Sequence, residues 1–182
     1  MSTAISRTLI FFGILVLIFG GFLLFQRNTP QRLSFKNYQP ASQISHVEQQ
    51  SRMTIPSLNM DLEIIPSKIT NNVWEATSQG VSYLSSSPIP GEKGNSILYG
   101  HNWTSLLGNL TRIKPGEEIS INIKDKEKKT FIVEYVSIVG PNDTQILANT
   151  NDARITLYTC TGFLDSKRFV VTALLGSNEN KL

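Results

Sequence analysis

The amino-acid sequence predicts an all-β domain, a sandwich or a barrel, that follows an N-terminal transmembrane helix. Beyond residue 50 the apolar runs are short and rich in β-branched residues. Clusters of Pro and Gly, as at residues 87–91 and 140–142, separate these runs at short intervals. Many short strands with frequent turn signals are typical of all-β folds. An uncharged apolar run near the N-terminus predicts the helix.

This apolar run extends from Leu9 to Phe25, seventeen residues without a charge. Its length matches the ~17–25 residues that a membrane-spanning helix needs. The alternative, a cleaved signal peptide, has an apolar core of ~7–15 residues followed by a small-residue cleavage site, which residues 22–27 do not offer. We therefore expect residues 8–26 to form an uncleaved anchor and residues 1–7 a short cytoplasmic N-terminus. The domain then lies on the extracytoplasmic side.

The positive charge of the chain does not predict a nucleic-acid partner. Of the 17 basic residues, Arg7, Arg27 and Arg32 lie in the first 32 positions, where there is no acid. The remaining 14 basic residues are balanced by 14 acidic ones. The excess therefore flanks the apolar run, and the domain carries no basic face of the kind that binds nucleic acid.

The remainder of the chain divides by composition. Residues 27–51 are rich in Gln, Ser, Asn and Pro and predict a polar linker that holds the domain away from the bilayer. His46 lies in this linker, and we expect it to be solvated. The folded domain is expected at residues 52–178, followed by a tail at residues 179–182. No internal repeat or low-complexity tract is present.

One hairpin is clear from the pattern of side chains. Apolar and polar residues alternate at positions 119–123 and again at 131–135, on either side of a charged turn at 124–129. Period-two alternation across a short turn predicts two antiparallel strands. Only residues 103–113 and 144–148 have helical character, and both segments are short.

The chain contains a single cysteine, Cys160, at the end of the β-type run 154–159. Arg168 opens the next apolar run, 169–175. A parallel crossover needs about a dozen residues, so the two runs should pair as antiparallel strands, with Cys160 and Arg168 together at one rim. Nearby positive charge favours the thiolate, and an unpaired cysteine in an exported domain is a candidate nucleophile.

His101 follows the apolar run 95–99, again where a strand gives way to a loop. The three residue types together supply a nucleophile, a proton carrier and an anion stabiliser. Each has a simpler interpretation alone: a structural histidine, an inert buried cysteine, and an arginine at the solvated start of a strand. Spacing in the sequence does not place His101 beside Cys160.

These residues carry a resemblance to a known family. Residues 156–160, T-L-Y-T-C, resemble the T-L-x-T-C signature of the sortases. Residues 168–171 resemble the arginine-bearing strand of that family, and residues 100–101 resemble its histidine segment. The similarity extends to residues 55–64 and 109–117 and to the anchor and linker, so it covers nearly the whole chain.

The resemblance implies an eight-stranded β-barrel and a membrane-bound cysteine transpeptidase. Such enzymes cut an LPxTG-like sorting motif of a secreted protein and transfer the new carboxyl end to an amine. The resemblance gives Cys160 the role of the nucleophile that forms a thioester. It gives His101 the proton transfers to the departing amine and from the incoming one. Arg168 is expected to hold the substrate and stabilise the oxyanion.

The resemblance also suggests residues that contact the substrate. The hydroxyl of Thr159 would lie near the thiol, although neighbours on a strand face opposite ways unless the strand bends. Ile146 and Leu147, in the loop before the nucleophile strand, would line a pocket for the leucine and proline of the motif, or would cap the barrel core.

No cofactor or metal is expected. The loop acids Glu92, Asp143 and Asp152 are interpreted as solvated carboxylates and not as calcium ligands. The residues after Cys160 match no single sortase subclass, so the motif and the acceptor (a cell-wall peptide or a pilin-type lysine) stay open. A cysteine peptidase that transfers the acyl group to water, and a non-catalytic surface scaffold, are the alternative functions. The expected location is the bacterial cell membrane, with a single pass.

Overall fold

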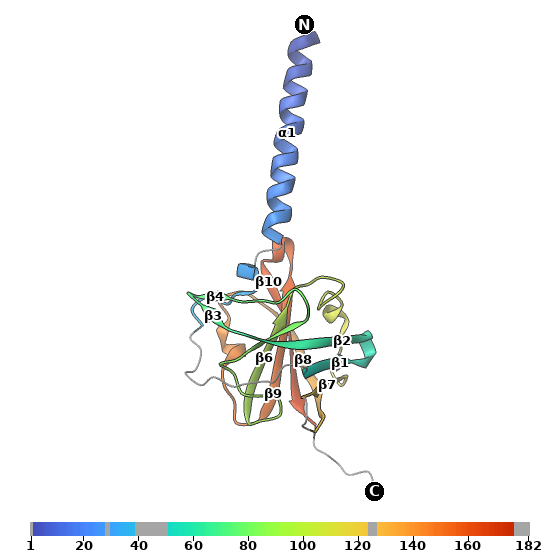
Figure 1. Ribbon diagram of the computed structural model, residues 1–182, viewed down its shortest axis with the longest axis vertical. Helices are drawn as coiled ribbons and strands as arrows, with labels where there is room; N and C mark the ends of the chain where they lie inside the picture. The colour runs from blue at the N-terminus through green and yellow to red at the C-terminus, as the bar shows by residue number, and fades with distance from the viewer. Residues whose placement is uncertain (1, 28–29, 39–50, 124–126, 177–182) are drawn as a thin grey trace.

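The computed structural model describes residues 2–27, 30–38, 51–123 and 127–176, which form one long helix and a β domain (Figure 1). The helix is α1 (Ser2–Arg27). The strands are β1 (Ser51–Ile55), β2 (Met60–Ser67), β3 (Ile69–Thr70), β4 (Val73–Trp74), β5 (Val81–Leu84), β6 (Gly94–Gly100), β7 (Glu118–Asn122), β8 (Lys129–Val139), β9 (Ala153–Thr161) and β10 (Lys167–Leu175). Short 3-10 helices are η1 (Pro30–Leu33), η2 (Pro56–Leu58), η3 (Leu110–Arg112), η4 (Thr144–Leu147) and η5 (Phe163–Asp165).

Eight of these strands close into a barrel in the order β1-β2-β5-β6-β9-β10-β8-β7. Two pairs, β2 with β5 and β6 with β9, are parallel, and the other pairs are antiparallel. Strands β3 and β4 form a separate two-stranded ribbon. The prediction of an all-β fold is confirmed in its barrel form, with the eight strands that the resemblance implied.

The side chains that alternate along the strands fill the barrel. The β7–β8 hairpin is antiparallel, as the alternating pattern predicted, and Ile119 lies opposite Phe131. Both side chains are fully buried in the interior cluster, together with residues of each other barrel strand. The interior is apolar because each strand turns every second side chain inward.

The short helices were predicted only in part. Residues 144–148 form the 3-10 helix η4, whereas residues 103–113 are mainly turns that end in η3. A tight turn replaces the expected helix at Gly108, whose amide donates to the carbonyl of Trp103 (2.8 Å). A Cβ at position 108 would lie 2.7 Å from that same carbonyl oxygen, so this turn requires glycine.

Strands β6, β9 and β10 are buried on both faces. Their outward side chains belong to a second apolar group, which we call the outer cluster. It comprises Leu33, Phe35, Trp74, Leu84, Ile97, Tyr99, Leu147, Tyr158, Cys160 and Val170. Burial on both faces explains why these strands are near-continuous apolar runs in the sequence.

A segment of the expected linker covers the outer cluster. Residues 30–38, which we call the strap, begin with η1 and pack against β9 and the β3–β4 ribbon. Leu33 and Phe35 are buried, and the hydroxyl of Tyr158 donates to the carbonyl of Leu33 (3.0 Å). The expectation of a solvated spacer is therefore wrong for the strap. The rest of that linker, residues 39–50 with His46, and the predicted tail lie outside the described residues.

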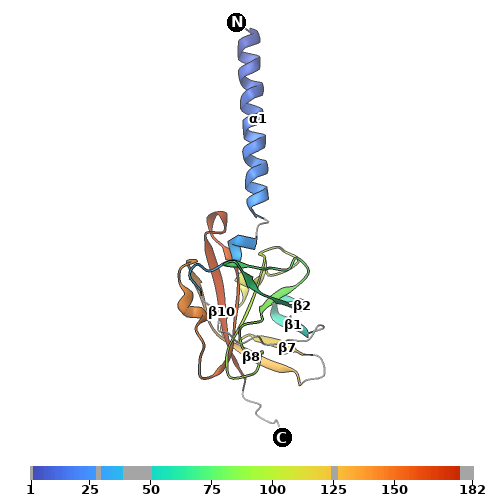
Figure 2. The same ribbon diagram turned by 60° about the vertical axis from the view of Figure 1, so that its left-hand side comes forward.

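Helix α1 corresponds to the predicted anchor. Its segment Ser6–Phe25 is long and apolar enough to cross a membrane, and its large apolar side chains are exposed. Figures 1 and 2 show the helix standing away from the barrel, with its C-terminal end beside the start of β10.

The strap makes one prediction about folding. A chain that begins at residue 49 should still unfold cooperatively, because the barrel interior is intact, but its outer cluster should be exposed. We expect the fluorescence of Trp74 to shift to longer wavelength relative to a chain that begins at residue 30. The Trp74→Phe variants of both chains, measured in parallel, should lack this difference. Loss of the cooperative transition in the shorter chain would contradict a barrel that is stable without the strap.

Candidate active site

Cys160 and Arg168 meet across the β9–β10 pair. The two strands are antiparallel, and Arg168 is the register partner of Cys160. The prediction that these two residues lie together at one rim is thus confirmed. Alternation along β9 turns Cys160 outward, away from the barrel interior, together with Tyr158.

His101 is brought to the same end by a pairing that the sequence did not predict. It follows β6, which runs parallel to β9 with Gly100 opposite Thr159. His101 and Cys160 are therefore the next residues along two neighbouring parallel strands. The imidazole is 7% exposed and stacks on Trp103, with ring centroids 4.4 Å apart and an interplanar angle of 8°.

Arg168 is a buried charge, 3% exposed, whose donors are largely used by the backbone. Its Nη1 donates to the carbonyls of Asp165 and Lys167, each at 3.0 Å, and its Nη2 to the carbonyl of Ser34 at 3.1 Å. The guanidinium also lies 5.9 Å from the ring centroid of Phe35, within range of a cation–π contact. Its Nε is buried and has no hydrogen-bond partner among the described residues.

The thiol of Cys160 is covered by the strap. Its Sγ donates to the carbonyl of Arg32, 3.1 Å away, and the residue is 5% exposed. Burial raises the pKa of Cys160 to about 11, although the positive charges of Arg168 and Arg32 oppose this shift. Arg168 therefore favours the thiolate as expected, but burial outweighs it in this closed arrangement.

Burial also acts on His101. It lowers the pKa of the imidazole, and the nearby carboxylate of Asp165 opposes this effect. Since a thiol with a raised pKa and an imidazole with a lowered pKa are both uncharged near neutral pH, the closed site holds a neutral pair.

Asp165 is a residue that the sequence analysis missed. Its carboxylate accepts hydrogen bonds from Asn102 Nδ2 (2.9 Å) and Arg32 Nη1 (3.1 Å), while its carbonyl accepts from Arg168. Asp165 thus contacts the residue after His101, the strap and Arg168. No local pattern indicates this role, because the two partners of its carboxylate are 63 and 133 positions away.

The strap residues were also missed. Within the polar linker, Leu33, Phe35 and Tyr38 form a short series of apolar side chains. That series was the available signal, but three such residues in a polar context also occur in unstructured linkers. The strap supplies three successive carbonyls, those of Arg32, Leu33 and Ser34, to side chains of β9 and β10.

Thr159 lies on the other face of β9 from Cys160, because the strand does not bend there. Its hydroxyl donates to the carbonyl of Gly100 (2.8 Å), immediately before His101. In this position it ties β9 to the loop that carries the histidine.

Ile146 and Leu147 belong to the same side of the barrel as Cys160. Leu147 is buried in the outer cluster and Ile146 packs against it, so both cover the outer face and not the barrel interior. Asn95 holds this segment in place, since its Nδ2 donates to the carbonyls of Ile146 (3.0 Å) and Ala148 (3.2 Å).

Among the described residues, no group of three or more His, Cys, Asp or Glu side chains lies close enough to hold a metal ion. Two of the loop acids have local partners: Asp143 accepts from the amide of Gly140 (2.7 Å), and Asp152 pairs with Arg154.

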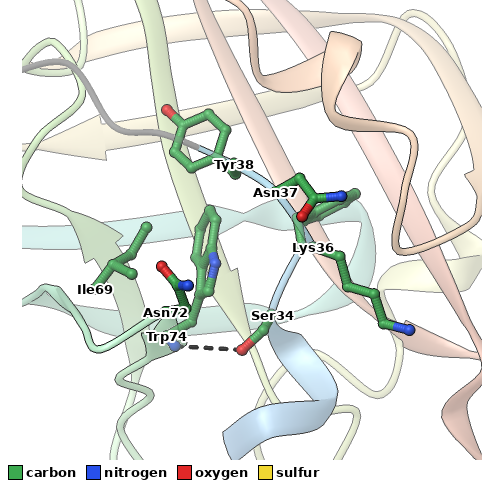
Figure 3. Close-up of a pocket in the computed structure, with 8 residues that line it drawn as sticks. Ser34, Lys36, Asn37, Tyr38, Ile69, Asn72 and Trp74 are labelled. Atoms are coloured by element: carbon green, nitrogen blue, oxygen red, sulfur yellow. Dashed lines mark hydrogen bonds between the residues drawn. The ribbon is translucent and has the colours of Figure 1, made fainter.

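Figure 3 shows a pocket between the strap and the β3–β4 ribbon. Its volume is about 250 Å³. The amide of Trp74 donates to Ser34 Oγ (3.3 Å) at one side, and the ring of Tyr38 closes the other. Cys160 does not line this pocket, so in the closed arrangement the pocket gives no access to the thiol.

Comparison with known proteins agrees with this architecture. The family model of the sortase domain matches residues 53–176. Sortase A of Bacillus anthracis is 30% identical over 135 residues, which cover 71% of this chain and 61% of that protein. The chain thus spans less than two thirds of the length of this curated relative.

Two solved structures of Corynebacterium diphtheriae sortase A have similar folds. One has a TM-score of 0.64 at 26% identity and covers 75% of this chain and 65% of that one. A lid mutant of the same protein has a TM-score of 0.62 at 26% identity and covers 73% and 74%. The residues that match the family model run from β1 to the end of β10 and include Cys160, His101 and Arg168. The chain belongs to the sortase family.

Proposed function

We propose that this protein is a membrane-anchored cysteine transpeptidase that acts on an LPxTG-like sorting motif of secreted proteins. Cys160, His101 and Arg168 are its catalytic residues. The observation that carries the proposal is the meeting of the only thiol, a buried guanidinium opposite it and an imidazole on the adjacent strand. Family membership supports the same assignment.

The chemistry assigns one role to each group. The sulfur of Cys160 attacks the carbonyl carbon of the Thr–Gly bond, and the bond to the glycine nitrogen then breaks to leave a thioester. His101 takes the proton of the Cys160 thiol, gives it to the departing amine, and later takes a proton from the incoming amine and returns it to the sulfur when the thioester bond breaks. The unpartnered Nε of Arg168 is a donor for the oxygen that becomes negatively charged in each step.

Three further residues support the catalytic residues: Thr159, Ile146 and Leu147. Thr159 is a positioning residue, because its hydroxyl holds the backbone at Gly100 beside His101. Ile146 and Leu147 offer apolar surface for the leucine and proline of the motif, next to the outer cluster that contains Cys160.

The strap must move before a substrate can react. It occupies the hydrogen-bonding positions of both Cys160 and Arg168, so an acyl substrate has to replace its carbonyls. Since one similar structure is that of a lid mutant of a sortase A, we assign the strap of this chain the part of a lid.

The acceptor is an amine of a cell-wall peptide or of a protein subunit. We place the domain on the extracytoplasmic side of the bacterial membrane, where secreted substrates meet it, with α1 as the single span. No observation favours a peptidase that transfers the acyl group to water, so that activity is an outcome of the test below.

The test is a ligation assay. The full chain in detergent is incubated with an LPxTG-type peptide, with and without an added amine, and products are identified by mass. We expect a ligation product with the amine present, and none from Cys160→Ala. Hydrolysis alone would indicate a peptidase, and a thiol that never acylates would indicate a scaffold.

Arg168 should be irreplaceable by a simple charge. A lysine keeps the positive charge but lacks the planar fork that bonds several carbonyls at once. Loss of one well-placed donor at an oxyanion site costs about 10²–10³ in rate. We therefore expect Arg168→Lys to lose most of the rate of thioester formation, and Arg168→Ala to lose at least as much, with both proteins folded by circular dichroism. A near wild-type rate of thioester formation for Arg168→Lys would show that the planar guanidinium of Arg168 is not required.

The closed strap should be visible in the pH dependence of thiol alkylation. Burial raises the pKa of Cys160 to about 11, so the alkylation rate by iodoacetamide should keep rising with pH up to that range. A plateau below pH 9 or so, the ordinary range for a cysteine, would contradict the buried thiol.

Arg32 gives a sharper version of this experiment. Its side chain bonds Asp165 and the carbonyl of Leu164, so Arg32→Ala and Arg32→Lys should both loosen the strap. Hydrogen bonds to charged groups contribute about 1.5–3 kcal/mol, so we expect about tenfold faster alkylation at pH 8 for both variants. If Arg32 acted only through its charge, which lowers the pKa of the Cys160 thiol, its removal would slow alkylation. Arg32→Ala would then be alkylated more slowly, and Arg32→Lys, which keeps the charge, would be unchanged.

A further inference from the structure

Two apolar side chains project from the connection between β9 and β10. Phe163 is 84% exposed and Leu164 is 48% exposed. They follow the thiol-bearing Cys160 by three and four positions. Phe163 is the most exposed large apolar side chain of the described residues, those of α1 included. Exposed apolar side chains that gather at one place mark sites of contact with proteins or membranes.

The connection is held firmly in this conformation. Its carbonyls at Leu164 and Asp165 accept hydrogen bonds from Arg32 and Arg168, and the carboxylate of Asp165 accepts from Asn102. Leu164 and Asp165 have φ angles of 50° and 58°, in the left-handed region that side chains rarely adopt. Such a backbone persists only where its surroundings determine it, so the exposure of Phe163 is built into the fold.

The connection lies close to the end of α1. The helix ends at Arg27, and Arg32 already donates to the carbonyl of Leu164 (3.1 Å). Five residues span at most ~17 Å when fully extended, and less here because η1 lies between the two points. Both views show this connection beside the C-terminal end of the helix (Figures 1 and 2).

We infer that Phe163 and Leu164 insert into the interface of the bilayer that α1 spans. This inference rests on the membrane anchor of the proposed function. Each interfacial layer is roughly 5–8 Å thick, so the connection is within reach of it. The exposed Lys167, next to the apolar pair, matches the anionic headgroups of such a surface. Aromatic and aliphatic side chains beside a basic residue are typical of interfacial contacts.

The consequence is a second attachment that fixes the active site relative to the membrane. Cys160 lies three residues from Phe163, so at most ~11 Å separates the Cα atoms of the nucleophile and of the inserted residue. With the connection inserted, the thiol and His101 are held next to the bilayer surface.

The test uses spin labels on the full chain in nanodiscs of phosphatidylglycerol and phosphatidylethanolamine. Cys160→Ser removes the native thiol but keeps a hydroxyl that can donate to the carbonyl of Arg32. In this background a single cysteine is introduced for the label, as Phe163→Cys, Leu17→Cys or Asn151→Cys. Asn151 is the matched control, because it is exposed at the opposite end of β9, roughly 30 Å away along a strand of 9 residues. Each label is measured for its accessibility to oxygen and to a water-soluble nickel complex.

For each label we compare its accessibility to oxygen with its accessibility to the nickel complex. We expect this ratio at position 163 to be severalfold higher than at position 151 and lower than at position 17. A ratio at 163 equal to that at 151 would overturn the inference. Shielding of 163 from both reagents would also overturn it, because a protein surface would then cover the ring. An aqueous label at 17 would remove the anchor and the inference together. Catalysis is not measured here, so failure of the transpeptidase assignment would be seen only in the ligation assay.

Discussion

The buried guanidinium of Arg168 is the interaction on which the rest of the site depends. A permanent charge that is 3% exposed is costly unless its donors are paired. The bonds from Nη1 to Asp165 and Lys167 shape the β9–β10 connection, and the bond from Nη2 to Ser34 holds the strap. One charge therefore organises the connection, the strap and the surroundings of the thiol opposite it. Among the described residues its Nε has no hydrogen-bond partner, and this is the donor to which we assign the substrate in the proposed function.

The period of two along β9 determines how the thiol is covered. Leu157 points into the barrel, whereas Tyr158 and Cys160 point outward into the outer cluster. The barrel interior therefore does not have to open for the thiol to be reached. The strap lies above it and accepts the hydrogen bond of the thiol, and the strap is not a strand of the barrel.

The features that the sequence predicted depend on local patterns. The β7–β8 hairpin follows from alternation, and the meeting of Cys160 with Arg168 follows from a connection too short for a crossover. The position of His101 could not be derived in this way, because the parallel pairing of β6 with β9 joins residues about sixty positions apart. The resemblance to sortases was what assigned His101 and Cys160 to one site. The helix expected at 103–113 is replaced by a tight local turn, in which the backbone of Gly108 approaches the carbonyl of Trp103 more closely than a helix allows.

The strap was missed because its free energy of docking comes from distant partners and is small overall. Burial of Leu33 and Phe35 contributes about 1.5–3 kcal/mol each, and each hydrogen bond adds about 0.5–1.5 kcal/mol. Fixing the backbone costs about 1–2 kcal/mol per residue. For the nine residues of the strap this backbone cost is at least as large as these gains, so no more than a small net free energy holds the strap in place.

A small docking free energy suits the part of a lid that we propose for the strap. If the closed state is favoured by about 1.4 kcal/mol, one molecule in roughly ten is open, and a substrate loses only about tenfold in apparent affinity. A longer apolar strap would bury more surface and would exclude the substrate from Cys160. A fully polar one would leave the outer cluster, with Trp74 and Tyr158, exposed to water. The strap has only three apolar side chains, Leu33, Phe35 and Tyr38, in a polar segment, so its composition is intermediate between these two cases. For the same reason it resembles an ordinary linker in the sequence.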